Sequence, residues 1–213
     1  MLCYEMTVNA NDYFCPMKKF AKGLLKLLGW KLEGVPPEGH KKLLIVEAPH
    51  TSNWDYLIGM LLITSVGIKV NVIIKKELFF WPLGPLLRWI GGMPIDRTAN
   101  QSKVDALAGM FKKKESLNLA ITPEGTRSLN RNWKKGYYFI ALKAGVPIWL
   151  TAIDYGRKTG ILGPLIYPSG NYEEDLKKIE KFYRGITAKF PEKFNLSPQY
   201  LREENDGVNR DIS

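Results

Sequence analysis

The sequence is poor in cysteine and contains no long hydrophobic run. Cys3 and Cys15 are the only cysteines among 213 residues. Two cysteines exclude a disulfide scaffold and a four-thiolate zinc site, and they favour a reducing compartment. No apolar stretch approaches the roughly 18–20 residues that a membrane-spanning helix requires. The N-terminus also lacks the basic, apolar and small-residue sections of a signal peptide. The sequence therefore predicts a soluble, intracellular protein.

Acidic residues are also in deficit. The chain has 31 Lys and Arg against 21 Asp and Glu, a net charge of +10. Such a charge attracts nucleic acid, anionic lipid headgroups or a polyanionic substrate, or it simply covers a solvated surface. The basic residues are scattered along the chain, and no RNA-binding or zinc-finger pattern is present. We therefore expect no nucleic-acid partner.

The chain contains no internal repeat and no low-complexity segment. Its length fits one domain spanning 1–213, with a loose polar tail over 198–213. Strands are predicted at Lys42–Glu47, Lys69–Ile74, Met93–Ile95, Leu117–Ile121 and Pro147–Ile153. Helices are predicted at Asn53–Ile63, Ser102–Lys114, Gly136–Ala144 and Tyr172–Ile186, and Glu77–Ile90 is helical or irregular. This alternation predicts an α/β domain with a mostly parallel sheet and helices on both faces.

A basic amphipathic helix is predicted before the sheet, over 17–31. Its apolar face carries Met17, Phe20, Ala21, Leu24, Leu27 and Leu28, and four lysines lie opposite. This is the pattern of a helix that lies in a membrane surface and turns its basic side toward anionic headgroups. A helix that packs its apolar side on the domain would show the same pattern. The segment alone does not decide between these alternatives.

His50 is the more promising of only two histidines. His40 lies in a loop after Pro36 and Pro37 with no carboxylate placed to orient it, and we interpret it as a surface residue. His50 follows the predicted strand 42–47, and Asp55 comes five residues later. A hydrogen bond between them would fix the tautomer of a general base. Ser52 and Asp55 also match a helix capping box, which is a purely structural alternative compatible with the first.

Two further candidates follow predicted strands. Thr122–Ser128 places Pro123 and Gly125 in a tight turn, after which Thr126 and Arg127 offer donors for a phosphate group. Arg97 follows the short strand 93–95. Each arginine could instead be an ordinary surface residue.

Topology brings these candidates together. His50, Arg97 and the turn Glu124–Arg127 each follow a strand, so all of them lie at the carboxyl edge of the predicted sheet. Open α/β sheets bind ligands at this edge. A base, a carboxylate and two arginines there indicate proton abstraction beside an anionic substrate.

The ordered motifs resemble the glycerophospholipid acyltransferases, whose best-known members act on lysophosphatidic acid. The blocks are His50-x4-Asp55, Gly91-x-x-Pro94-Ile95-Asp96-Arg97, Pro123-Glu124-Gly125-Thr126-Arg127-Ser128 and Val146-Pro147-Ile148. Lys134-Lys135-Gly136 also matches, and the likeness covers a catalytic core at 42–154. Four blocks in order make this resemblance specific.

The resemblance implies a role for each matching residue. His50 would be the general base and Asp55 its orienting partner. Phosphate binding would fall to Arg97, Glu124, Gly125, Thr126 and Arg127. Lys135 and Pro147 would belong to the acyl-donor pocket. No acyl-enzyme, metal or resident cofactor is implied.

The implied reaction moves a fatty acyl group from acyl-CoA or acyl-carrier protein to a hydroxyl of 1-acylglycerol-3-phosphate. The implied partners are the lysophospholipid, the acyl thioester and a membrane surface with anionic lipid. The implied location is the cytoplasmic face of a membrane, in peripheral or monotopic form. Acylation of another lysolipid or of glycerol-3-phosphate is an alternative. A non-catalytic basic module that binds membrane or nucleic acid is another.

Overall fold

The core of the molecule is a seven-stranded sheet. The computed structural model describes residues 10–95 and 102–196, with side chains from residue 16 onward. The strand order across the sheet is β1-β7-β6-β2-β5-β3-β4. The strands are β1 Lys31–Gly34, β2 Lys42–Glu47, β3 Asn71–Lys75, β4 Gly92–Ile95, β5 Leu117–Ile121, β6 Ile148–Asp154 and β7 Thr159–Ile166.

Five of these strands run parallel and confirm the predicted mostly parallel sheet. They are β6, β2, β5, β3 and β4. Strand β7 pairs antiparallel with β6, and β1 pairs parallel with β7 at the sheet edge. The sequence analysis missed both β1 and β7. All four residues of β1 are exposed, and β7 contains two glycines and a proline, so neither shows apolar alternation.

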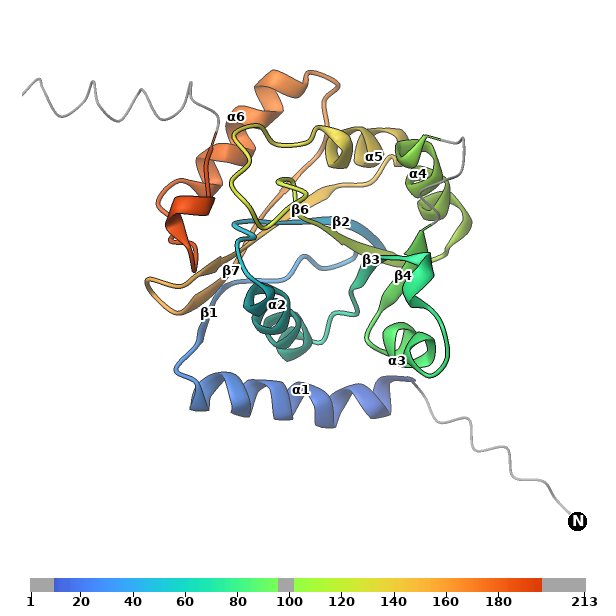
Figure 1. Ribbon diagram of the computed structural model, residues 1–213, viewed down its shortest axis with the longest axis vertical. Helices are drawn as coiled ribbons and strands as arrows, with labels where there is room; N and C mark the ends of the chain where they lie inside the picture. The colour runs from blue at the N-terminus through green and yellow to red at the C-terminus, as the bar shows by residue number, and fades with distance from the viewer. Residues whose placement is uncertain (1–9, 96–101, 197–213) are drawn as a thin grey trace, which may run out of the picture.

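Helices cover both faces of the sheet, as predicted (Figure 1). The α-helices are α1 Ala10–Leu27, α2 Asn53–Val66, α3 Leu83–Trp89, α4 Lys103–Lys113, α5 Gly136–Ala144 and α6 Tyr172–Tyr183; two short 3₁₀ turns are η1 Lys76–Leu78 and η2 Pro191–Lys193. Helices α1, α2 and α3 lie on one side of the sheet, and α4, α5 and α6 lie on the other. The largest apolar cluster fills the α4–α6 side, and smaller clusters lie beneath α1 and α2.

Helix α1 differs from the predicted helix over 17–31. It begins at Ala10 and ends at Leu27 because Gly29 takes a positive φ of 75°, which favours glycine and stops the helix. Lys31 is therefore the first residue of β1. Ala21 and Leu25 are buried against the domain, whereas Phe20 and Leu27 are exposed. The expected apolar face is thus divided between the protein interior and solvent.

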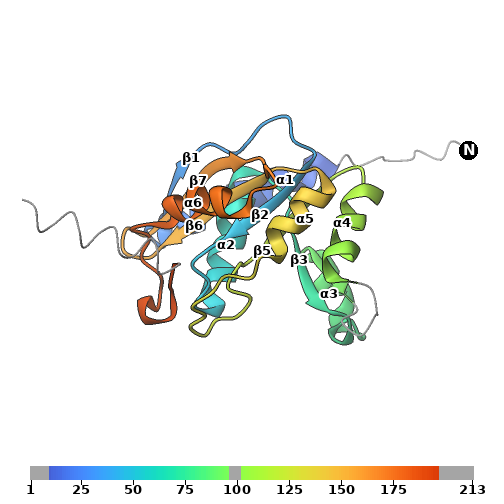
Figure 2. The ribbon, with the colours of Figure 1, turned by 90° about the horizontal axis from the view of Figure 1, so that it is seen from above.

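The loops that follow the parallel strands gather on one side of the molecule. Figure 2 shows the start of α2, the β5–α5 connection and the segment after α6 projecting from that side. This is the edge at which the sequence placed the candidate site. Arg97 and the predicted tail over 198–213 lie outside the described residues.

Candidate active site

The β2–α2 turn brings His50 and Asp55 together. Strand β2 ends at Glu47, and Ser52 caps α2 by accepting a hydrogen bond from the Trp54 N–H. The turn places His50 Nδ1 3.5 Å from Asp55 Oδ2. Catalytic hydrogen bonds are often long in a protein without substrate and shorten when it binds. The other ring nitrogen, Nε2, is the one left for a substrate.

Asp55 serves the helix cap and the histidine at the same time. Its Oδ2 accepts the backbone N–H groups of Thr51 and Ser52, each at 2.7 Å. Its Oδ1 accepts the Tyr155 hydroxyl at 2.7 Å. Burial alone would raise the pKa of Asp55, but the hydrogen bonds from His50, Tyr155 and the backbone outweigh it and lower that pKa below its usual 3.8. Asp55 is therefore a firmly held carboxylate beside the imidazole.

Glu124 holds the backbone of His50 in place. Its Oε1 accepts the His50 N–H at 2.9 Å, and the side chain is only 2% exposed. Burial raises the pKa of Glu124, and the bond from the His50 backbone opposes that rise. Glu124 thus connects the turn after β5 to the turn after β2, and its predicted part in phosphate binding stays a prediction.

Three carboxyl groups influence the charge of His50. Burial disfavours the charged ring, but the hydrogen bond to Asp55 and the charges of Glu47, Asp55 and Glu124 outweigh it and raise the pKa of His50 above 6.5. Burial also raises the pKa of Glu47 from 4.5 to about 7, and the nearby His50 only partly opposes this. The site is therefore built to stabilise an imidazolium that forms when His50 takes a proton.

The turn after Glu124 is open to solvent, and Lys134, for which the motif resemblance implied no role, lies against it. Gly125, Thr126 and Arg127 are all exposed. A Cβ on Gly125, which has a φ of 64°, would lie 2.6 Å from Lys134 Nζ, so the Lys134 side chain rests against this turn. Lys134 and Arg127 thus flank the same turn and offer cationic groups to an anionic ligand.

Two residues expected in the acyl-donor pocket lie elsewhere. Lys135 Nζ bonds Glu173 Oε1 at 3.1 Å and sits over the Tyr172 ring at 4.5 Å, so it is bound to α6. Pro147 precedes β6 at the amino edge of the sheet, where its carbonyl accepts the Leu44 N–H. The site is at the opposite, carboxyl edge. Pro147 therefore lies at the other end of β6 from the dyad, and its part in binding the acyl donor stays a prediction.

Tyr155 bonds Asp55 but was not among the residues predicted for the site. It comes directly after β6, and its ring packs edge-on against Trp30 with centroids 5.3 Å apart. Lys189 lies 4.8 Å above the Trp54 ring and 5.8 Å above that of Tyr155. The position of Tyr155 directly after a strand could have indicated it from the sequence, because His50 and Glu124 were selected on that basis.

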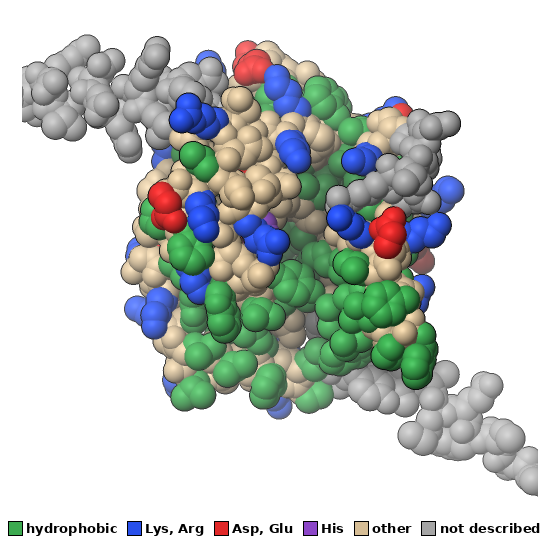
Figure 3. Space-filling view, in the orientation of Figure 1, with side chains coloured by type: hydrophobic (Ala, Val, Ile, Leu, Met, Phe, Trp, Pro, Cys, Tyr) green, Lys and Arg blue, Asp and Glu red, His purple; other side chains and the backbone are tan. Residues whose placement is uncertain are grey.

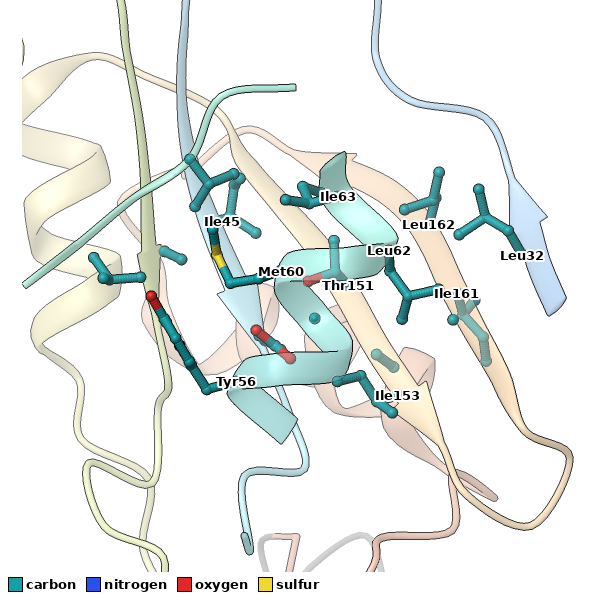
Figure 4. A pocket seen from close by; sticks show the side chains of 17 residues that line it. Leu32, Ile45, Tyr56, Met60, Leu62, Ile63, Thr151, Ile153, Ile161 and Leu162 are labelled. Carbon is teal, nitrogen blue, oxygen red and sulfur yellow. The ribbon is translucent and has the colours of Figure 1, made fainter. Parts of the chain in front are cut away.

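An apolar pocket lies between α2 and the sheet (Figure 4). Neither His50 nor Asp55 lines it, but Tyr56, the neighbour of Asp55, does. The pocket holds about 530 Å³ of space, part of it open to solvent. Its walls come from one side of α2 and from β1, β2, β3, β5, β6 and β7; Tyr56, Met60, Ile63, Thr151 and Ile153 are among them. Glu47 is its one acidic lining residue. Only about 50 Å³ of the pocket's space is deep enough to hold a water-sized group, and its mostly apolar lining suits hydrocarbon atoms.

The part of the chain that the structure describes has no group of three His, Cys, Asp or Glu side chains arranged for a metal ion. The same residues do contain a histidine facing a buried carboxylate, with cationic side chains on neighbouring loops. In the same residues, no helix is long and apolar enough to cross a membrane.

A histidine paired with a buried carboxylate at the carboxyl edge of an α/β sheet, with cationic side chains nearby, is compatible with an enzyme that acylates hydroxyl groups. The acyltransferase family model matches residues 31–153, which is more than half of the chain. The chain therefore belongs to the acyltransferase family, and the resemblance drawn from its motifs is confirmed.

A solved structure similar to this chain is the crystal structure of the 1-acyl-sn-glycerophosphate (LPA) acyltransferase PlsC from Thermotoga maritima. The TM-score is 0.56 at 21% identity, over 94% of this chain and 81% of that chain. This likeness confirms the α/β fold. Among curated proteins, no significant match was found.

Proposed function

We propose that this acyltransferase moves a fatty acyl group from an acyl thioester to a hydroxyl of 1-acylglycerol-3-phosphate or a close phosphate-bearing relative. The observation that carries the proposal is the His50–Asp55 dyad beside the Gly125–Arg127 turn, with the apolar pocket adjoining. The dyad supplies the base, the turn and Lys134 supply cations for a phosphate, and the pocket suits the acyl chain. The LPA acyltransferase of similar fold supports the choice of acceptor.

In the proposed mechanism, His50 Nε2 takes the proton of the acceptor hydroxyl as its oxygen attacks the thioester carbonyl. Asp55 stabilises the imidazolium through Nδ1. The tetrahedral intermediate then collapses, the C–S bond breaks, and the proton passes from His50 to the leaving thiolate. General base catalysis of this kind contributes about 10²–10⁴-fold.

Helix starts commonly supply an oxyanion site, but most N–H groups from the turn into the first residues of α2 are already engaged. The backbone N–H groups of His50, Thr51, Ser52 and Trp54 already donate to Glu124, Asp55 or the Ser52 hydroxyl. The developing negative charge must therefore be met by other donors. The cations near the mouth of the site, Lys189 among them, are the candidates.

The test is thioester release by purified protein with long-chain acyl-CoA and acyl-carrier protein donors across an acceptor panel. The panel contains lysophosphatidic acid, lysophosphatidylcholine, glycerol-3-phosphate and monoacylglycerol. Release with lysophosphatidic acid well above the others, absent in His50→Ala, supports the proposal. A preference for an acceptor without phosphate would overturn the acceptor class while leaving an acyltransferase.

A lipid surface is the proposed source of the acceptor, and the exposed apolar residues support docking on it. Figure 3 shows hydrophobic side chains across the lower part of one face, over α1, α2 and α3, below a zone of Lys and Arg. Leu27 is 83% exposed and Trp81 85% exposed. Phe20 and Trp89 are exposed as well. Aromatic and aliphatic groups beside lysines suit the interface of a membrane with anionic lipid.

The docking proposal is tested by flotation with vesicles of phosphatidylglycerol and phosphatidylcholine. The double variant Phe20→Glu, Leu27→Glu is expected to lose most of the vesicle-bound fraction while keeping its thermal unfolding temperature. Val35→Glu alters an equally exposed apolar residue beyond β1, and it serves as the matched control. Unchanged flotation of the double variant would contradict docking through α1.

A further inference from the structure

The pocket beneath α2 contains polar atoms that have no partner. Glu47 Oε1 and the Tyr56 hydroxyl are both buried, and neither bonds any atom among the residues described. Both side chains line the pocket. Buried polar atoms without a partner are rare in proteins, and each requires an explanation. In a binding pocket, the simplest explanation is a polar group on the ligand.

The fold makes room for the Glu47 carboxyl. Leu43, Ile45 and Glu47 alternate on the face of β2 that α2 covers, so the carboxyl points toward the helix. The residue opposite is Gly59, where a Cβ would lie 2.7 Å from Glu47 Oε1. Glycine is disfavoured inside a helix. Its presence at this contact is explained by the carboxyl that it accommodates.

Glu47 also lies near the reacting end of the pocket. It precedes His50 by three residues, a span of at most about 10 Å even in extended chain, and the two charges act on each other. Because its pKa is about 7, Glu47 carries a proton in much of the protein near neutral pH. A protonated carboxyl both donates and accepts a hydrogen bond, as a hydroxyl does.

We infer that the pocket prefers an acyl chain bearing a hydroxyl group near its thioester end, bonded to Glu47, with Tyr56 as a second polar contact. This rests on the proposed function, because it identifies the pocket as the site of the acyl donor. A plain chain leaves the Glu47 carboxyl buried and unpaired, whereas a hydroxyl on the third carbon pairs it. Glu47 is thus a specificity-determining residue.

The experiment measures binding of 3-hydroxytetradecanoyl-CoA and tetradecanoyl-CoA by calorimetry without acceptor, and then kcat/KM for both donors with lysophosphatidic acid. Wild-type protein is expected to favour the hydroxylated donor about tenfold, which corresponds to about 1.4 kcal/mol. Glu47→Leu should abolish this preference, and Glu47→Gln should retain most of it. The volume-conserving change Met60→Leu, on the same pocket wall, should leave it unchanged.

The binding and transfer measurements separate the two proposals. Equal binding of both donors by wild-type protein, binding of neither, or an unchanged preference in Glu47→Leu would each overturn the inference about Glu47. Preferential binding that disappears in Glu47→Leu, without transfer to any acceptor, would support that inference and refute the proposed function. A donor hydroxylated at the far end of the chain checks position, because it should bind no better than the plain chain.

Discussion

Replacing Asp55 by Asn separates its two roles, since the change removes a charge but little volume. In the native protein the carboxylate accepts two backbone N–H groups and the Tyr155 hydroxyl at 2.7 Å each, and it faces His50 Nδ1 at 3.5 Å. An amide keeps one acceptor oxygen. That oxygen must take the Oδ2 position, because an NH₂ there would face the donors of Thr51 and Ser52.

The expected loss of stability follows from these contacts. Hydrogen bonds to a charged group contribute about 1.5–3 kcal/mol each, against about 1 for neutral pairs. Since the geometry of most bonds is retained, Asp55→Asn should reduce the free energy of unfolding by about 2–3 kcal/mol. Denaturant titration at neutral pH measures this loss.

The catalytic effect has a definite sign. Asp55 raises the pKa of His50, so removing its charge lowers that pKa and stabilises the neutral ring. The acidic limb of the kcat/KM profile should therefore move to lower pH, while kcat falls because the imidazolium loses its partner. The fall cannot exceed the whole contribution of the base, about 10²–10⁴-fold.

Asp175 provides a matched control. It is also a buried carboxylate at a helix start, where it accepts bonds from Ser169 and from the Tyr138 hydroxyl at 2.9 Å, far from the dyad in the fold. Asp175→Asn should cost similar stability and leave the pH profile in place. Because the pKa of Glu47 is also about 7, both pH profiles are measured in a Glu47→Gln background as well. If the acidic limb of Asp55→Asn coincides with that of the wild type, the reasoning is refuted.

Four further substitutions have expected outcomes. His50→Ala should reduce kcat by about 10²–10⁴-fold with an unchanged circular dichroism spectrum, and near-normal thioester release would reject its role as base. Arg127→Ala and Lys134→Ala should each raise KM for lysophosphatidic acid about tenfold but not for monoacylglycerol, because a charge-assisted phosphate contact is worth about 1.5–3 kcal/mol. Native Glu47 keeps its proton to about pH 7, whereas the unfolded chain loses it near 4.5. Wild-type stability should thus fall as pH rises through this window, and Glu47→Gln should gain about 3 kcal/mol relative to wild type between about pH 4 and pH 8. Urea titrations at about pH 4 and about pH 8 measure the free energy of unfolding of both proteins. If the difference between Glu47→Gln and wild type is the same at both pH values, this prediction is wrong.

The local sequence pattern was sufficient to predict a helix or strand when the residues of that element alone identify it. Leu117–Ile121 and Gly136–Ala144 were predicted with the bounds that the structure has, since the first is a short apolar run and the second ends at a glycine with φ of 66°. The dyad was predicted for the same reason, because His50 and Asp55 share one turn. Strand β7 was missed because its pairing with β6 and β1, rather than its own composition, makes it a strand.

Contacts between distant segments explain most of what the sequence did not reveal at the site. Lys134 and Lys135 are adjacent and chemically alike, yet one rests on the Gly125 turn and the other bonds Glu173 on α6. Which lysine turns which way depends on how α5 begins. Tyr155 likewise meets Asp55 across 100 positions of sequence.

Glu47 is different, because its signal was present in the sequence. Leu43, Ile45 and Glu47 share one face of a buried strand by simple alternation. A carboxyl group at the third of these positions interrupts an apolar face, and burying it costs free energy unless something pairs with it. Glu47 Oε1 finds no such partner among the described residues, which leaves a ligand to supply it. An interrupted apolar face three residues before a catalytic base therefore indicates substrate selection, and the hydroxylated donor tests that reasoning directly.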